Sequence, residues 1–567
     1  MKTAARTSIA FIALLIIPAI LLPGCNQSRT PSLLYSQPTG LTILGLDGAT
    51  WEIIDPLIER GELPGFKALK ERGAWGQLET YVPTESVSIW TTLATGVSPS
   101  RHGIQTFTRR IPGTDQSVPA PGTDRQVPAL WNMVSDAGKS VVCVKWFATW
   151  PAEKVNGAML SPRLEEEDAE PRTWPPELFS EISHFRHLST MDQLPQPPGR
   201  PGMARSGSAA APPEAPLEQS PGAPPMLIGQ SQVESTMFDD TSVWLAGKYV
   251  FETYHPDLFM IYLKSTDRVE HFLWGAHTDF EGDPIRKQEA EVIFGWYRYY
   301  DGLIQQLLAD PGRTLMVISD HGMRAQSAVP EPYYIWDIDF DGILELIGYL
   351  NRHAGGTDWD TTRAYTYRHL PYDKSFIVRL NMTGREPRGS VNEDMVLQTV
   401  RDVIRGLSAL QTSDGRPLFA SVGTTDAPGE ILCRLSDDVT LDDAFESDGQ
   451  RFIMRDLVIR KGLPRGIHTD APPGIIAVLG PGIAPGTRVT GASVFDVTPT
   501  ALHLLNLPTA RDFDGRVLIE LFDPEYLAAH PVESIPTYGR RTVESRLSSS
   551  GGDERMLDEL RALGYIQ

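Results

Sequence analysis

Short apolar runs that alternate with helix-like segments constrain the fold of this chain more than any other feature. The runs that resemble buried strands cover residues 41–46, 140–146, 258–263, 314–319 and 474–479. Segments with helical periodicity lie between them, at residues 51–60, 64–72 and 290–308. Strands that alternate with helices predict an α/β three-layer fold with a mostly parallel central sheet covered on both faces. In such sheets functional groups gather at the carboxyl ends of the strands.

Aspartates and histidines follow several of these runs. They occupy four separate places in the chain: Asp47, Asp267 with His271, Asp320 with His321, and His468. Asp267 and His271 are four residues apart, so a helix would put both on one face. A mixture of imidazole and carboxylate groups favours zinc or a similar transition metal, whereas calcium and magnesium prefer oxygen ligands. The pattern therefore predicts a site for two divalent metals.

Residues 83–88 add hydroxyl groups at the start of a predicted helix, residues 86–94. Two metals that flank a hydroxyl nucleophile are suited to in-line displacement at phosphorus. Ser86 is the candidate nucleophile, and Thr84 and Ser88 are rivals that the sequence separates poorly. These observations predict a metal-dependent phosphohydrolase.

The first 24 residues have the features of an export signal. Lys2 and Arg6 precede an apolar stretch from residue 9 to 22, which is short for a spanning helix. Residues 22–25 read Leu-Pro-Gly-Cys, which resembles the bacterial lipoprotein cleavage motif and predicts lipidation of Cys25. An ordinary secretory signal is the alternative. We expect an exported protein that is lipid-anchored in the bacterial cell envelope, periplasmic or on the outer surface, with residues 25–39 as its tether.

The remaining sequence predicts one catalytic domain with insertions. Its first part spans residues 40–335 and contains a Pro-, Gly- and Ser-rich segment at 194–232, which we interpret as a flexible insertion. Residues 336–461 are expected to form a cap or subdomain, with a helix at 392–410 and a strand at 376–380. The closing part of the catalytic domain follows at 462–522, and a C-terminal extension at 523–567.

Composition narrows the classes of partner. Only Cys143 and Cys433 remain beyond Cys25, both in apolar runs, so we expect buried thiols and no disulfide framework. The formal net charge is −21, and removing a leader that contains Lys2 and Arg6 changes it to −23. Such an acidic protein is a poor partner for a nucleic acid polymer.

Taken together, the motifs resemble those of the type I phosphodiesterase and nucleotide pyrophosphatase family of the alkaline phosphatase superfamily. The matching stretches are residues 44–50, 83–104, 265–271, 318–323, 466–468, 495–507 and 514–516. The resemblance implies the alkaline phosphatase-like fold. It also implies that Asp267, His271 and His468 hold one metal, and that Asp47, Asp320 and His321 hold the other. By the same resemblance, Ser86 contacts a metal and forms a phospho-Ser intermediate, with zinc the expected ion and manganese possible.

One position departs from the family pattern. The nucleotide pyrophosphatases place an Asn that contacts a phosphoryl oxygen shortly after their His-Gly-Ile step, and here that position is Phe107. Nucleotide specificity is therefore not carried over. Lys145, Lys264 and Arg268 lie near strand ends and could contact phosphate, although surface charge is the simpler interpretation.

We expect a phosphodiesterase. The alternatives are a phosphoryl or phosphoethanolamine transferase acting on envelope glycans or lipids, and a non-catalytic envelope lipoprotein that keeps the fold. A sulfatase is less favoured because its Cys/Ser-x-Pro-x-Arg segment is absent. The sequence leaves open the substrate, the choice between monoester and diester, and the oligomeric state.

Overall fold

A computed structural model describes the chain from Thr39 to Arg541, with internal gaps. The described residues are 39–110, 117–164, 169–187, 230–278, 284–325, 335–353, 356–370, 375–425, 427–440, 442–447, 450–462, 466–468 and 470–541. The predicted signal peptide, Cys25, nearly all of the tether, and most of the predicted insertion at 194–232 lie outside them. Within the described residues, no helix combines the length and apolar character needed to cross a bilayer.

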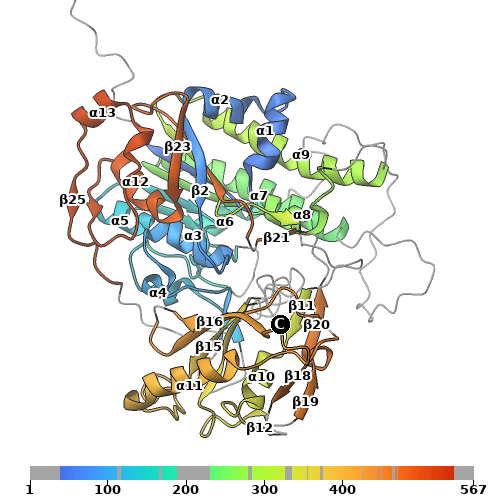
Figure 1. Cartoon of the computed structure of the whole chain (residues 1–567). Coiled ribbons are helices and arrows are strands. Elements are labelled where there is room, and N and C mark those ends of the chain that lie inside the picture. Colours follow the sequence, from blue (N-terminus) through green and yellow to red (C-terminus); the bar gives the residue numbers. More distant parts are fainter. Residues whose placement is uncertain are drawn as a thin grey trace, which may run out of the picture.

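A nine-stranded, mostly parallel sheet forms the centre of the larger lobe (Figure 1). Its strand order is β23-β2-β22-β9-β1-β8-β5-β6-β7. The bounds are β1 Leu41–Leu46, β2 Ala74–Glu79, β5 Val141–Val144, β6 Gly157–Leu160, β7 Thr173–Trp174, β8 Leu258–Leu263, β9 Thr314–Ile318, β22 Gly474–Leu479 and β23 Thr487–Ser493. Only β22 and β7 run antiparallel to their neighbours. The α/β fold class predicted from the alternating runs is confirmed.

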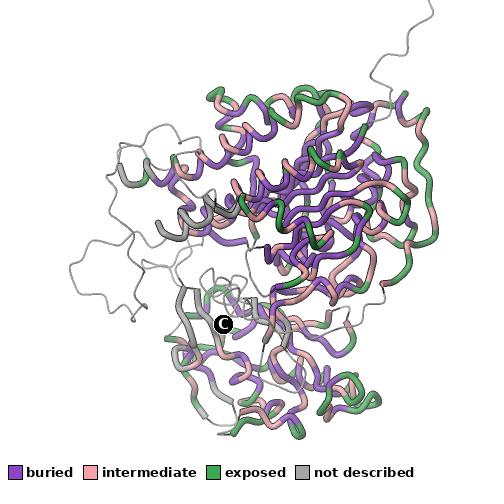
Figure 2. The backbone as a smooth tube through the Cα atoms, turned by 180° about the vertical axis from the view of Figure 1, so that it is seen from behind, coloured by how far each residue is buried: buried purple, intermediate pink, exposed green. Residues whose placement is uncertain are grey.

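Helices cover both faces of this sheet because the strand residues alternate between two cores. Leu44 and Leu46 of β1 belong to one core, and Leu41 and Ile43 belong to the other. The first core is covered by α1 (Trp51–Glu59), α2 (Pro64–Arg72), α7 (Gln230–Tyr254), α8 (Ser265–Leu273) and α9 (Pro284–Leu307). The second is covered by α3 (Ser86–Thr95), α5 (Leu130–Asp136) and α12 (Val497–Leu504). The buried sheet stands out in Figure 2.

A close approach explains the glycine inside β1. A Cβ atom on Gly45 would lie 2.6 Å from the ring of Trp90, a buried residue of α3. Gly45 thus lets α3 pack directly on the sheet. This packing brings the start of α3 towards the carboxyl end of β1.

The smaller lobe has its own hydrophobic core and lies below the larger lobe in Figure 1. It contains an antiparallel sheet of β14 (Ala364–Leu370), β15 (Ser375–Leu380), β17 (Glu430–Leu435) and β16 (Phe419–Thr424), in that order, packed with α10 (Phe340–Leu346) and α11 (Val396–Ser408). The chain enters and leaves through a paired β11 (Ile335–Ile338) and β20 (Val458–Gly462). The helix expected at 392–410 is shorter, since residues 393–395 form a 3₁₀ turn and α11 ends at Ser408. We refer to this lobe as the cap.

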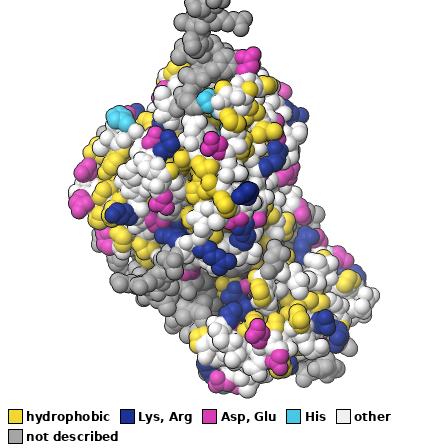
Figure 3. Space-filling view, turned by 90° about the vertical axis from the view of Figure 1, so that its left-hand side faces the viewer, with side chains coloured by type: hydrophobic (Ala, Val, Ile, Leu, Met, Phe, Trp, Pro, Cys, Tyr) yellow, Lys and Arg dark blue, Asp and Glu magenta, His cyan; other side chains and the backbone are white. Residues whose placement is uncertain are grey.

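Short elements complete the two lobes. They include α4 (Pro99–His102), β3 (Thr108–Arg110), β4 (Ser117–Pro119), α6 (Leu178–Ile182), β10 (Arg324–Ala325), β12 (Arg352–His353), β13 (Gly356–Thr357), β18 (Ala444–Ser447), β19 (Gln450–Ile453), β21 (Gly466–Ile467), β24 (Thr509–Ala510), α13 (Pro524–Ala529) and β25 (Ser534–Ile535). The last of these, β25, pairs in parallel with β24, so the described part of the C-terminal extension, residues 523–541, lies along the larger lobe. Basic and acidic side chains are interspersed on the face in Figure 3. Cys143 and Cys433 are buried free thiols, as predicted.

Candidate active site

The carboxyl ends of β9, β1 and β8 are adjacent in the sheet and bring three aspartates together. Asp47 directly follows β1, Asp267 lies in the first turn of α8 after β8, and Asp320 follows β9. All three are buried. The sequence analysis placed these residues at strand ends, and the strand order explains why they meet.

The Asp47 loop is fixed by contacts to its neighbours. Asp47 N donates to Leu263 O at 3.0 Å, and Asp267 N donates to Asp47 O at 3.0 Å. Gly48 has φ +72°, and a Cβ atom there would lie 3.0 Å from Asp267 Cα. Both the positive φ and the close approach require glycine. The turn therefore places the backbone of Asp47 and Gly48 against the start of α8.

Two side chains that the sequence analysis missed orient the Asp47 carboxylate. The Tyr262 hydroxyl donates to Asp47 Oδ2, and Trp90 Nε1 donates to the same oxygen at 3.3 Å. Asp47 Oδ1 receives no hydrogen bond from the described residues. One carboxylate oxygen is thus held, and the other is available to a cation.

Three side chains form a first group that could hold a metal: Asp267, His271 and His468. His468 Nε2 lies 2.9 Å from Asp267 Oδ1 and 2.8 Å from His271 Nε2. His271 Nδ1 lies 2.8 Å from Gly466 O. Because a carbonyl only accepts, Nδ1 carries the proton and the lone pair of His271 Nε2 faces the group, which is the arrangement of a metal-binding histidine.

A second group surrounds His321. Its Nε2 lies 3.2 Å from Asp320 Oδ2, 3.5 Å from Asp47 Oδ1 and 3.2 Å from Ser86 Oγ. The ligand atoms of Asp47, Asp267 and His321 lie within 4.8 Å of one another. Asp267 is therefore shared between the two groups, a feature absent from the division of ligands that the resemblance implied. The six Asp and His ligands expected from the sequence lie together, and Ser86, the seventh expected ligand, contacts His321.

The electrostatics of the site favour bound cations. Burial, and then the charges of Asp320 and Asp267, raise the pKa of Asp47 well above its ordinary value. Burial and the charge of Asp267 raise the pKa of Asp320 to about 7. Burial opposes ionisation of Asp267 as well, but His271 and His468 hold its pKa well below the ordinary value. Buried carboxylates that repel one another, with Asp320 Oδ2 also lacking a hydrogen bond from the described residues, fit divalent metals.

Of the three candidate nucleophiles Ser86, Thr84 and Ser88, Ser86 has a side-chain contact with a histidine of this centre. It is the first residue of α3, is 1% exposed, and lies 3.2 Å from His321 Nε2 through its Oγ atom. The two rivals make other contacts. Ser88 Oγ lies 3.0 Å from the Tyr81 hydroxyl, and Thr84 Oγ1 donates to Tyr81 O at 3.5 Å. These contacts favour Ser86 as the nucleophile.

The helix that carries Asp267 and His271 depends on a further buried carboxylate. Asp240 of α7 accepts hydrogen bonds from Lys264 N at 3.1 Å and Ser265 N at 2.9 Å, at the start of α8. Tyr300 donates to the same side chain at 2.5 Å. Asp240 is far from α8 in sequence, and no motif points to this role.

The three basic residues near strand ends and Phe107 differ in how far they are buried. Lys145 is buried rather than on the surface, and Lys264 and Arg268 are half-buried. Phe107 is also buried, with its ring centroid 5.6 Å from that of Phe147. Phe147 in turn lies 4.8 Å from the Tyr262 ring. The position where the family has Asn is thus part of an aromatic group next to Asp47.

The chain was also compared with known proteins. The family model "Type I phosphodiesterase / nucleotide pyrophosphatase" matches residues 41–446, a range that contains every predicted ligand except His468. No curated protein sequence matches the chain.

Several solved structures are similar. Human ectonucleotide pyrophosphatase/phosphodiesterase 5 is 13% identical, with a TM-score of 0.47 over 85% of this chain and 100% of that one. An inactive variant of the murine protein, in complex with AMP, is 13% identical, with a TM-score of 0.44 over 86% of this chain and 100% of that one. Phosphonoacetate hydrolase from Sinorhizobium meliloti 1021, in complex with phosphonoformate, is 16% identical, with a TM-score of 0.45 over 83% of this chain and 97% of that one.

The family match covers more than half of the chain and includes the strand ends that carry the three aspartates. The chain therefore belongs to a family of metal-dependent hydrolases of phosphoric ester bonds, the type I phosphodiesterase/nucleotide pyrophosphatase family of the alkaline phosphatase superfamily.

Proposed function

We propose that the protein is a two-metal phosphodiesterase that acts through a phosphorylated Ser86. The observation that carries this proposal is the position of Ser86 Oγ, 3.2 Å from His321 Nε2 and at the edge of the Asp/His groups. The mixture of carboxylate and imidazole donors favours zinc, with manganese as the second choice.

The Asp and His side chains would bind the two cations in two groups. Asp267, His271 and His468 would hold one cation, and Asp47, Asp320 and His321 the other, with Asp267 close to both. Bound divalent cations would lower the pKa of the Ser86 hydroxyl and stabilise negative charge on the phosphoryl oxygens. Backbone amides at the start of α3 would be directed at the same anion.

The reaction would have two displacements at phosphorus. Ser86 Oγ, after losing its proton to solvent, forms a bond to phosphorus while the bond to the leaving ester oxygen breaks. Water then attacks the phosphorus of this intermediate, which still carries the second ester group. The bond to Ser86 Oγ breaks, the phosphate monoester is released, and Ser86 Oγ regains its proton. The tight packing around Ser86, which is 1% exposed, would hold its side chain in place for both displacements.

The test is a comparison of Ser86→Ala with Ser88→Ala. Both serines lie in α3 and both are buried, so the second variant is a matched control. Ser86→Ala should lower kcat/KM by at least about a thousand-fold, with metal content retained. Acid quench of the wild-type reaction should trap the phosphoryl group, with its remaining ester group, on the peptide that contains Ser86. Phosphate on Thr84 or Ser88, with Ser86 unmodified, would refute this choice of nucleophile.

Substrate class is tested in parallel with aryl phosphodiester, phosphomonoester and sulfate substrates. We expect the diester to be hydrolysed fastest. A clear preference for sulfate would overturn the proposal.

Export and lipid anchoring are also part of the proposal and are supported by residues 1–25 alone. Full-length protein produced in a bacterial host should enter the detergent phase on Triton X-114 partitioning. A Cys25→Ser variant should not, and equal partitioning of the two would argue against the anchor.

A further inference from the structure

The loop that follows β5 borders the candidate active site. We define the β5 loop as residues 145–153. Strand β5 lies beside β8 in the sheet, and Val144 pairs in register with Ile261, the residue before Tyr262. The β5 loop therefore starts next to the tyrosine that donates to Asp47.

A cluster of aromatic rings extends from that tyrosine. Phe147 of the β5 loop is half-buried, and its ring lies 4.8 Å from Tyr262 and 5.6 Å from Phe107. A partly exposed ring that packs on the tyrosine bonded to Asp47 can contact the part of a substrate that does not react. Aromatic rings bind apolar and aromatic groups, and they do not reproduce the polar contact of an amide side chain.

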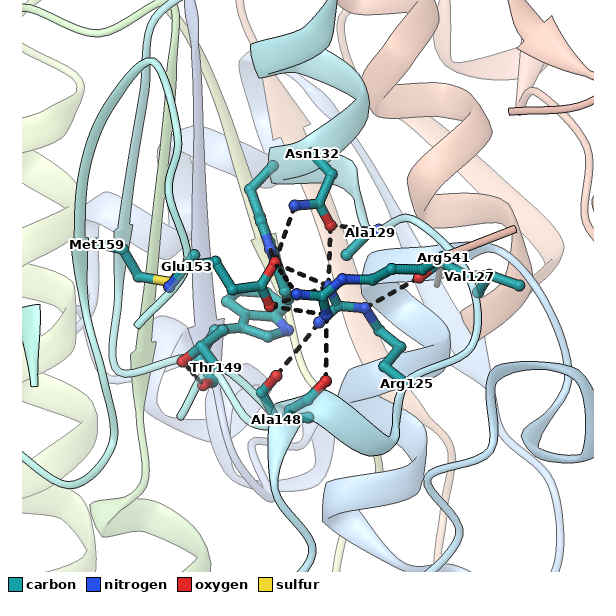
Figure 4. A network of polar contacts seen from close by, with 12 residues as sticks. Arg125, Val127, Ala129, Asn132, Ala148, Thr149, Glu153, Met159 and Arg541 are labelled. Carbon is teal, nitrogen blue, oxygen red and sulfur yellow. Dashed lines mark hydrogen bonds and ion pairs between the residues drawn. The ribbon is translucent and has the colours of Figure 1, made fainter. Parts of the chain in front are cut away.

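Both ends of the β5 loop are fixed. At the start, Trp146 Nε1 donates to Trp90 O at 2.9 Å, which ties the loop to the helix of Ser86. At the far end, Glu153 is the centre of a buried polar network (Figure 4). Arg125 Nη2 contacts both Glu153 oxygens, at 3.0 and 3.1 Å, and Arg125 Nη1 donates to Ala148 O at 3.2 Å.

The C-terminal extension completes this network through Arg541. Its guanidinium lies 3.2 Å from Glu153 Oε1 and 3.0 Å from Oε2, although the two residues are 388 positions apart. Arg541 also donates to Gly122 O at 3.2 Å, and its backbone N donates to Gln126 O at 2.9 Å. Gly122 N in turn donates to Trp150 O at 2.6 Å, so Arg541 reaches the β5 loop by two routes.

Two arginines share the Glu153 carboxylate, and the desolvation of these charged groups opposes folding. Burial and the charge of Arg125 lower the pKa of Arg541 to about 10. Buried ion pairs often contribute little net stability, because desolvation offsets attraction, yet their geometry is specific. The network is therefore better suited to fixing the position of the loop than to adding stability.

We propose that Arg541 is a positioning residue that holds the β5 loop, and that Phe147 on this loop contacts an apolar or aromatic ester group of the substrate. This inference rests on the proposed phosphodiesterase function. It assigns the C-terminal extension a role in substrate selection rather than in the reaction at phosphorus.

The test compares two diesters with the same leaving group, phenyl p-nitrophenyl phosphate and methyl p-nitrophenyl phosphate, on the metal-loaded full chain. The quantity measured is the ratio of kcat/KM for the phenyl ester to that for the methyl ester. The wild type should favour the phenyl ester, and Phe147→Ala should lower the ratio about ten-fold. Arg541→Ala should lower it in the same direction by raising KM for the phenyl ester, with kcat for the methyl ester nearly unchanged.

Two variants make the result specific to Arg541. Arg540 is adjacent and exposed, so Arg540→Ala should match the wild type for both esters. Arg541→Lys keeps the charge and should restore part of the ratio, since lysine lacks the planar fork of arginine. It also replaces Arg541→Ala as the decisive variant if the alanine protein does not fold.

Several outcomes would overturn the inference. They are an unchanged ratio in Phe147→Ala, an unchanged ratio in the decisive Arg541 variant, or an equal loss of kcat for both esters. A wild-type protein that hydrolyses neither diester would instead refute the proposed function itself.

Discussion

The substitution Tyr262→Phe tests how the Asp47 carboxylate is prepared for a cation. Tyr262 is buried, and its hydroxyl donates to Asp47 Oδ2. Burial and the charge of Asp47 raise the pKa of Tyr262 well above its ordinary value, so the hydroxyl remains a donor at any assay pH. Phenylalanine keeps the ring and its packing against Trp90 and Phe147. The variant therefore removes one hydrogen bond and creates almost no cavity.

The expected magnitude follows from the contacts of Asp47. After the substitution, Trp90 Nε1 at 3.3 Å remains as a donor to Oδ2. A hydrogen bond to a charged acceptor contributes about 1.5–3 kcal/mol. That range corresponds to a roughly ten- to hundred-fold change in an equilibrium constant, which is also the usual cost of removing a group that orients a metal ligand. Metal affinity at the Asp47 group should fall by this factor.

The assay is calorimetric titration of metal-free protein with zinc. Tyr526→Phe is the control, because the Tyr526 hydroxyl is buried and receives or donates no hydrogen bond within the described residues. That variant should bind zinc as the wild type does. Equal affinities for Tyr262→Phe and wild type would show that Tyr262 packs beside Asp47 without orienting it.

Three further predictions concern stability. Asp240→Ala removes the acceptor at the start of α8 and should lower the free energy of unfolding by about 1–2 kcal/mol in urea denaturation, with looser binding of zinc by Asp267 and His271. Burial raises the pKa of Glu153, but the charges of Arg125 and Arg541 outweigh burial and hold this pKa below its ordinary 4.5. Ionised Glu153 therefore stabilises the folded protein above pH 4.5, and this stabilisation is lost as pH falls through the pKa of the folded state. Glu153→Gln should make Tm less dependent on pH in this acid range. Burial raises the pKa of Asp320 in the folded protein to about 7, whereas an ordinary aspartate has a pKa of 3.8. The metal-free protein therefore loses stability as pH rises from 3.8 to 7. Chelation should therefore lower Tm more at pH 8 than at pH 5.5, and a loss independent of pH would contradict this account.

Much of the site could be predicted because its ligands follow strands that are recognisable as apolar runs. The runs at 41–46, 258–263 and 314–319 became the neighbouring strands β1, β8 and β9. The carboxyl ends of parallel strands meet at one edge of a sheet. The positions of Asp47, Asp267 and Asp320 in the sequence thus indicated their proximity in space.

Residues that orient those ligands could not be found in the same way. Tyr262 lies inside the apolar run of β8, where an aromatic residue is normally read as core. Its hydroxyl matters only because Asp47 lies beside it on the next strand. Asp240 and Arg541 also lie away from their partners in sequence, by 24 positions from Lys264 and by 388 from Glu153, and most of their contacts are to backbone groups, which leave no spacing pattern.

The shared position of Asp267 links the two metal groups. Its carboxylate lies 2.9 Å from His468 Nε2, and its ligand atom is within 4.8 Å of those of Asp47 and His321. Its backbone N also donates to Asp47 O, so the two aspartates cannot move independently. A change at either group therefore alters the geometry and the charge seen by the other. In the proposed two-metal enzyme, the first cation would neutralise part of the carboxylate repulsion, so occupancy of one group should alter the metal affinity of the other.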